Sequence, residues 1–199
     1  VVLAGDTVKV GDSGAAAVLT SNGAGTLTVT TGGTENLVLN TNSGTASGAI
    51  TITDAANQDI LITPNGYGRA TFDGQGKIQS VAEKVTIEAT AATGTIAYDV
   101  LTQAVLNYTS DAAANWTLNI RGDGSNSLDS IMDTGESITI AHIVKQGSTP
   151  YYNSAVQVDG SSITPEWQGG SAPSAGNASS LDVYSYTIIK TGSATFTAL

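Results

Sequence analysis

The sequence predicts an all-β protein in two parts: a repetitive stem over residues 1–80 and a head domain over residues 81–199. Charged residues make up only 12% of the chain, about half the usual share. Thr and Val suit pleated strands, and 23 Gly residues supply the turns that many short strands need. Nine of the eleven aromatic residues lie beyond residue 80, so the larger core is expected in the head.

The stem is expected from a repeat of about ten residues. Short apolar segments begin at residues 7, 17, 27, 37, 50, 60 and 70, separated by turn-forming Gly, Asn and Pro. In five of these segments two apolar residues lie two positions apart, which is the period of a strand with one apolar face. The pairs are Leu27 and Val29, Leu37 and Leu39, Ile50 and Ile52, Ile60 and Ile62, and Ala70 and Phe72.

Strands this short bury too little apolar surface to be stable alone, so they must stack on something. A single-chain β-solenoid with about three strands per coil would do so, but its sequence would repeat about every thirty residues. An intertwined trimer could instead form a β-prism with the apolar pairs on its axis. The absence of a thirty-residue repeat favours the trimer. Its interface is then predicted at Leu27, Val29, Leu37, Leu39, Ile50, Ile52, Ile60, Ile62 and Phe72.

The head is predicted to be an antiparallel β-sandwich or jelly roll because eight or nine strand candidates alternate with turns. They cover residues 84–90, 95–101, 104–109, 115–121, 137–144, 154–160, 161–167, 181–190 and the C-terminal 194–199. Asp159 and Gly160 mark a hairpin turn, and Ser125 or Ser127 could cap a short helix that ends before Gly135.

The long loop of small residues over 167–180 is the expected contact segment of the head. Its candidate contact residues are Trp167, Gln168, Gly169, Gly170 and Asn177.

Composition also excludes several kinds of partner and cofactor. A formal net charge of −10 opposes binding to nucleic acid, which depends on Lys and Arg. No apolar run approaches the 18 to 20 residues, roughly, that span a bilayer, so we expect no membrane insertion. The chain has no Cys and a single His, so an ordinary zinc site cannot form within one chain and we expect no metal or cofactor.

Three places could carry chemistry, and each has a simpler interpretation that we favour. His142 shares a strand face with apolar residues, which suits a core or inter-chain position better than a catalytic base. Residues 121–133 resemble an integrin tripeptide and part of a calcium loop but lack the closing Glu, which favours a solvated turn. Glu166 lies beside Trp167 as in a sugar-cleaving site, yet packing of the Trp is the favoured role. We therefore expect a protein that is not an enzyme.

Two stretches carry a family resemblance. "DILITPNGYGRATFDG" (59–74) resembles a unit frequent in fibre and appendage proteins of tailed bacteriophages. Residues 120–199 are similar to the C-terminal domain of virion structural proteins of marine phages, including those of cyanobacteria. The most specific part is "TPEWQGGSAPSAGNASSLDVYSYTIIK" (164–190).

The resemblance implies an external virion protein on the capsid or the tail, trimeric, with a β-prism stem and a β-sandwich head. Its expected partners are two further copies of itself, other capsid or tail proteins, and a host-surface glycan or receptor. A fibre or spike is the leading interpretation. A capsid decoration (cement) protein, a carbohydrate-active fibre and a bacterial surface adhesin remain alternatives.

Overall fold

A computed structural model describes residue 25 and residues 29–32, 34, 36–40, 48–53 and 56–199. Its backbone contacts divide the chain into two units, Val1–Thr71 and Phe72–Leu199, called here the stem unit and the head unit. The sequence analysis divided the chain after residue 80, whereas these contacts group residues 72–80 with the head unit. The regular structure of the described residues is β except for one short helix, which confirms the all-β class.

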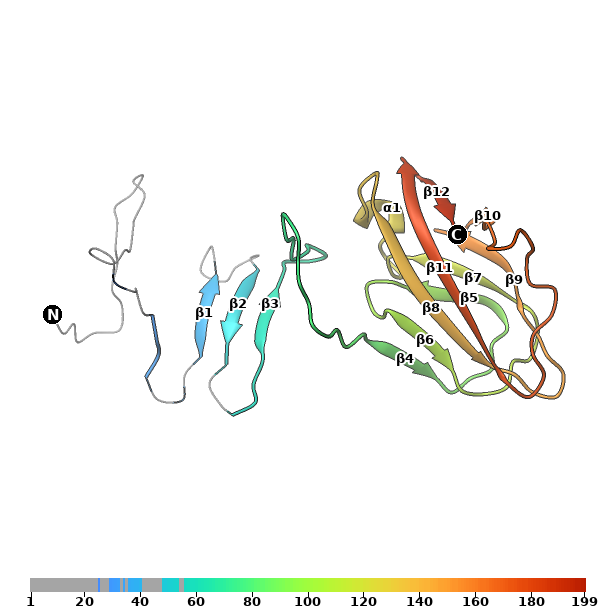
Figure 1. The fold of residues 1–199 in the computed structure, drawn as a ribbon, viewed down its shortest axis with the longest axis horizontal. Coiled ribbons are helices and arrows are strands. Elements are labelled where there is room, and N and C mark those ends of the chain that lie inside the picture. Colours follow the sequence, from blue (N-terminus) through green and yellow to red (C-terminus); the bar gives the residue numbers. More distant parts are fainter. Residues whose placement is uncertain (1–24, 26–28, 33, 35, 41–47, 54–55) are drawn as a thin grey trace. The chain divides into compact units, whose positions relative to one another are not determined.

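The stem unit contains a three-stranded antiparallel sheet in the order β1-β2-β3 (Figure 1). Its strands are β1 (Leu37–Asn40), β2 (Ala49–Ile52) and β3 (Ile60–Thr63), each four residues long as the repeat predicts. Each strand pairs with its neighbour in the sequence, whereas the coils of a solenoid would stack parallel strands. After β3 a turn closes with the Gly68 amide donating to the Asn65 carbonyl at 3.0 Å.

The strand expected at residues 70–73 is absent, and this part of the prediction is wrong. Gly74, at φ +136°, interrupts the extended backbone, and no described strand pairs with the segment. Phe72 therefore belongs to the head unit and not to the stem sheet. The expected strands at residues 7 and 17 lie outside the described residues, as does Leu27; Val29 and Thr30 are described and are not in a strand.

The head unit contains two sheets. The four-stranded sheet has the order β10 (Ser161–Ile163), β9 (Asn153–Val158), β7 (Trp116–Arg121) and β5 (Gly94–Asp99). The five-stranded sheet has the order β12 (Thr195–Ala198), β11 (Leu181–Gly192), β8 (Ser137–Lys145), β6 (Val105–Tyr108) and β4 (Val85–Glu88). All nine strands lie at expected positions, although β10 ends at Ile163 and not at Trp167.

The antiparallel prediction is wrong for the first six strands of the head. From β4 to β9, consecutive strands alternate between the two sheets, so neighbours within a sheet are every second strand and run parallel. Only the pairs β9–β10, β8–β11 and β11–β12 are antiparallel. The connections over residues 89–93 and 100–104 are as short as hairpin loops, yet they cross from one sheet to the other, whereas the connection from β7 to β8 is longer and contains a short helix. Length and turn residues alone do not distinguish these two kinds of connection.

A single hydrophobic core lies between the two sheets. Trp116 of the four-stranded sheet meets Tyr184 of the five-stranded sheet edge to face, with ring centroids 5.7 Å apart. The buried Asn153 amide links the layers, because it donates to the Trp116 carbonyl at 3.0 Å and accepts from the Tyr186 hydroxyl at 2.5 Å. Burial raises the pKa of Tyr186, so this hydroxyl keeps its proton and remains a donor.

The helix α1 (Leu128–Ile131) and the hairpin after β9 form one junction at an end of the sandwich. Ser127 caps the helix by accepting from the Ser130 amide at 3.1 Å, which confirms the predicted helical segment. Asp159 and Gly160 have φ values of +50° and +81°, which confirms the predicted tight turn. The Asp159 carboxylate also accepts from the Leu128 amide at 2.6 Å, so the turn holds the helix in place.

Candidate functional site

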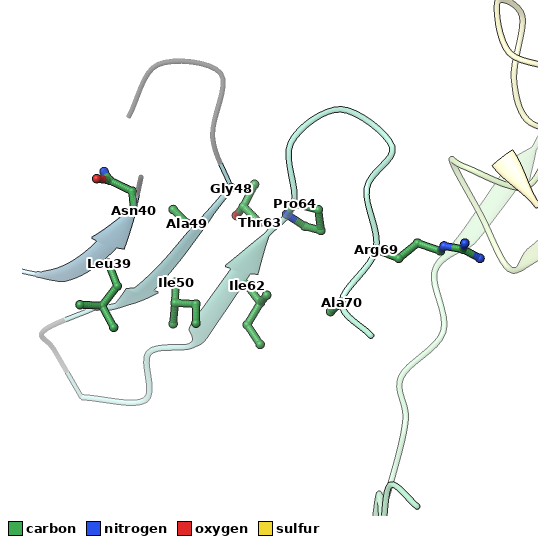
Figure 2. Close-up of a pocket in the computed structure, with 10 residues that line it drawn as sticks. All are labelled: Leu39, Asn40, Gly48, Ala49, Ile50, Ile62, Thr63, Pro64, Arg69 and Ala70. Carbon is green, nitrogen blue, oxygen red and sulfur yellow. The ribbon is translucent and has the colours of Figure 1, made fainter. Parts of the chain in front are cut away.

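The stem sheet gathers six large apolar side chains on one face, while Val38 and Leu61, also exposed, lie on the other. The register places Leu37 opposite Ile52 and Ile52 opposite Ile60, forming one row across the three strands. Leu39, Ile50 and Ile62 form a second row, and Figure 2 shows these three side chains projecting to the same side. We call these six residues the stem apolar face. It brings together six of the nine residues predicted to form an interface between chains.

The stem apolar face is open to solvent. Ile60 is 68% exposed, Ile62 50% and Ile50 40%, values far above those of core residues. The second row borders a groove of about 370 Å³ that continues over Pro64 and Ala70 (Figure 2). Exposed apolar patches of this kind mark interaction surfaces in soluble proteins.

The other predicted interface residues are placed differently. Val29 is exposed and outside any strand, and Phe72 is 71% exposed in the head unit. Leu27 lies outside the described residues. Neither Val29 nor Phe72 extends the two rows of the stem apolar face.

The predicted contact loop of the head divides into two parts. Trp167 is half-buried and packs against Tyr186 with ring centroids 5.7 Å apart, which confirms its packing role. Gln168, Gly169 and Gly170 form an exposed turn in which the Gly170 amide donates to the Trp167 carbonyl at 2.8 Å.

Asn177 makes a separate contact further along the loop. Its side-chain amide donates to the Asp182 carboxylate at 2.5 Å, and its backbone amide donates to the same carboxylate at 3.2 Å. Asp182 is buried at the start of β11, so the end of the loop is tied to the sandwich.

Trp167 also forms a wall of a cavity of about 310 Å³. Pro165 and Pro173 add apolar surface to this cavity, and Ser162 and Thr164 add hydroxyl groups. None of its lining residues carries a charge. A volume of this size with apolar walls and a few hydroxyls suits a small neutral ligand. Glu166 is exposed, does not line the cavity, and donates its backbone amide to the Ala198 carbonyl at 2.8 Å.

His142 lies in the core, which confirms the predicted core position, although neither ring nitrogen has a hydrogen-bond partner among the described residues. Its ring is fully buried and meets Tyr108 and Trp116 edge to face, with centroids 5.6 and 5.8 Å apart. Burial lowers the pKa of His142 to about 4, and the Leu106 backbone opposes this effect only in part. The imidazole is therefore neutral at pH 7 and has no access to a substrate.

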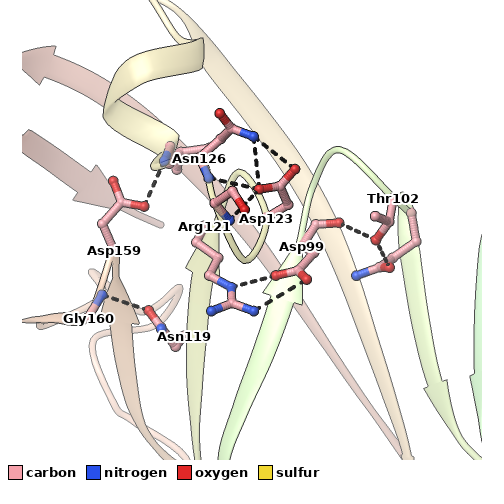
Figure 3. A network of polar contacts seen from close by, with 11 residues as sticks. Asp99, Thr102, Asn119, Arg121, Asp123, Asn126, Asp159 and Gly160 are labelled. Atoms are coloured by element: carbon pink, nitrogen blue, oxygen red, sulfur yellow. Dashed lines mark hydrogen bonds and ion pairs between the residues drawn. The ribbon is translucent and has the colours of Figure 1, made fainter. Parts of the chain in front are cut away.

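The loop that begins "RGD" is a structural turn. Arg121 forms an ion pair with Asp99 on the neighbouring strand at 2.6 Å, and hydrogen bonding to Asp99 raises the pKa of the Arg121 guanidinium (Figure 3). The Asp123 carboxylate accepts from the Ser125 and Asn126 amides at 2.7 and 2.8 Å, and these bonds help to lower its pKa. The carboxylate thus closes its own turn, as the solvated-turn interpretation predicts.

The sequence analysis missed Lys190 on β11. Its ammonium group is nearly buried, donates to the Asp129 and Met132 carbonyls at 2.6 and 2.8 Å, and pairs with the Asp129 carboxylate at 2.8 Å. These bonds hold the end of α1 against β11 and lower the pKa of Asp129. A charged residue at an inward position of a predicted strand was the only available signal.

Within the described part of the chain, no three His, Asp or Glu side chains come together to hold a metal ion. The described residues also include no helix that is long and apolar enough to cross a membrane.

Comparison with protein-family models, with curated proteins and with solved structures finds no match to this chain. The stem apolar face and the Trp167 cavity are therefore interpreted from their own geometry and chemistry.

Proposed function

We propose that this chain is a non-enzymatic structural protein on the outside of a tailed-phage virion, built as a trimeric fibre or spike. The stem supplies length and stiffness, and the head contacts a host surface or a neighbouring virion protein. The observation that carries the proposal is the stem apolar face, where two rows of Leu and Ile are exposed on a sheet of four-residue strands. The family resemblance of residues 59–74 and 120–199 supports the virion location.

Burial of the stem apolar face would supply the stability that the short strands lack. Completing the burial of a half-exposed Leu or Ile is worth about 1 kcal/mol, so the six side chains contribute about 6 kcal/mol per copy. The face carries no charged side chain, so three copies of a chain with a net charge of −10 can approach there without placing carboxylates against one another. Pairing of each strand with its sequence neighbour favours three flat walls around an axis over a solenoid.

The experiment that tests trimerisation compares two substitutions on the central stem strand. Ile50→Asp places a carboxylate in the stem apolar face, whereas Thr51→Asp places one on the opposite side of the same strand. Light scattering at micromolar concentration should give a trimer for the unchanged protein and for Thr51→Asp, and a smaller species for Ile50→Asp. A monomer for the unchanged protein would overturn the proposal.

A capsid decoration protein is the first alternative, and it would use the same stem and head. Copy number distinguishes the two roles, because a decoration protein is present in proportion to the capsid subunits. Imaging of the assembled particle would show its symmetry and whether the chain lies on the capsid or the tail.

The Trp167 cavity favours a second candidate function, which is binding of a neutral saccharide from a host surface. One face of a sugar ring is apolar and can lie on an indole, while its hydroxyls bond to side chains such as Ser162 and Thr164. The second tryptophan, Trp116, is buried, so quenching of fluorescence by added neutral hexoses would report on Trp167. No response with any hexose would discard this function.

A carbohydrate-active fibre is a further alternative that depends on Glu166. Loss of glycan cleavage in a Glu166→Gln variant would support it, and no cleavage of any host glycan by the unchanged protein would discard it.

A further inference from the structure

Each sheet of the head has an outer face directed away from the core, and the two outer faces differ in the composition of their side chains. Packing of the core does not require this difference. On the four-stranded sheet, the outward rows are polar or small: Thr95, Thr117 and Ala155, then Ala97, Asn119, Gln157 and Ser162, then the ion pair of Asp99 and Arg121. This is the usual composition of a sheet face in contact with water.

The outward rows of the five-stranded sheet are largely aliphatic. One row contains Val85, Val105, Ala141 and Ser185, the next contains Ile87, Asn107, Ile143 and Val183, and Thr139 and Thr187 follow. The Thr139 and Thr187 hydroxyls lie 2.9 Å apart, as expected for neighbours on one face. We call these ten residues the head outer face.

The head outer face exposes large side chains that would be costly to leave in water. Ile87 is 68% exposed and Val183 is 64% exposed, at the two sides of the same row. Exposed apolar residues also precede this face along the chain, at Phe72, Ile78 and Val81.

We propose that the head outer face is a contact between copies of this chain, with the five-stranded sheets of three heads turned toward a common axis. The inference deepens the proposed function and rests on it, because trimerisation of the stem would hold three heads at high effective concentration.

The chemistry of the face favours another copy as its occupant. The ten residues include no charged side chain. Lys145, which continues the same side of β8 opposite Leu181, pairs with Asp111 at 2.9 Å, so the face offers little to a charged partner. A second copy carries a net charge of −10 and can approach closely only where both surfaces lack carboxylates. A sheet face rich in β-branched residues also offers a regular apolar surface against which identical faces can pack.

Single cysteine substitutions test the contact, because the chain has no cysteine of its own. Ala141→Cys places a thiol in the middle of the head outer face, and Ala97→Cys places a more exposed thiol on the outer face of the other sheet, on its edge strand β5. Ile87→Cys and Val183→Cys sample the two sides of the face. Each full-length variant is treated with a short bismaleimide and separated on a denaturing gel, while light scattering gives the mass of the intact particle.

We expect covalent dimers for at least one of the three head-outer-face cysteines and only monomers for Ala97→Cys. A trimeric particle in which none of the three cross-links overturns this inference and leaves the stem trimer standing. Equal cross-linking of Ala97→Cys overturns it too, because the contact would then not be specific to this face. A particle that is monomeric and does not cross-link overturns both proposals.

Discussion

Acid should destabilise the head unit through His142, because this is a buried imidazole held neutral among aromatic rings. Burial lowers its pKa from 6.5 to about 4, so between these pH values the unfolded chain binds a proton that the folded head does not. The contribution of neutral His142 to stability is therefore complete above pH 6.5 and is lost progressively as the pH falls toward 4.

The size of the loss follows from the two pKa values. One pKa unit corresponds to about 1.4 kcal/mol, so the free energy of unfolding should fall by about 2 kcal/mol between pH 7 and pH 5 and by about 3 kcal/mol at pH 4. The pKa values of Asp123 and Asp129 are lowered from 3.8, so their contributions are lost only at lower pH. The interval from pH 7 to pH 5 therefore isolates the imidazole from these two carboxylates.

Urea unfolding at fixed protein concentration, followed by the fluorescence of the buried Trp116, measures this loss. The matched variant is His142→Phe, which keeps a ring in contact with Tyr108 and Trp116 but cannot bind a proton. Its stability should be nearly constant from pH 7 to pH 5, whatever its absolute value. An equal fall in the variant and the unchanged protein would refute the assignment to His142.

Two further predictions concern the junction at the end of the sandwich. Lys190→Met removes the ammonium group that donates to two carbonyls and pairs with Asp129. Urea unfolding at pH 7 should show a free energy of unfolding lower by about 3 kcal/mol. A loss below about 1 kcal/mol would contradict this role. Gly122→Ala would place a Cβ atom 2.6 Å from the Asn126 carbonyl oxygen and should cost about 2 kcal/mol, whereas Gly124→Ala, with its nearest neighbour at 3.9 Å, should cost much less. Similar thermal midpoints for the two Ala variants would count against the close packing of this turn.

Sequence period and turn chemistry were enough to place most strands. The pairs of Leu and Ile two positions apart correctly predicted β1, β2 and β3, and the register then aligned them on one face. Turn residues located the hairpin at Asp159 and Gly160, because positive φ values there restrict the choice of residues. These signals are local, so a single sequence is sufficient to read them.

The order of strands in the head could not be predicted in the same way. Whether a short loop returns to its own sheet or crosses to the other depends on packing of distant side chains, such as Trp116 against Tyr184. The head outer face was missed for the same reason. Val85, Ile87, Ile143 and Val183 come from three strands, and only the register brings them together.

The alternation of β4 to β9 between two sheets has a consequence for how the head folds and unfolds. Each new strand is added to the layer opposite the one before it, so neither sheet can be completed while the other is missing. Partial opening of one sheet would also displace the connections that lead into the strands of the other sheet. The two layers should therefore exchange their backbone amide hydrogens as one cooperative unit.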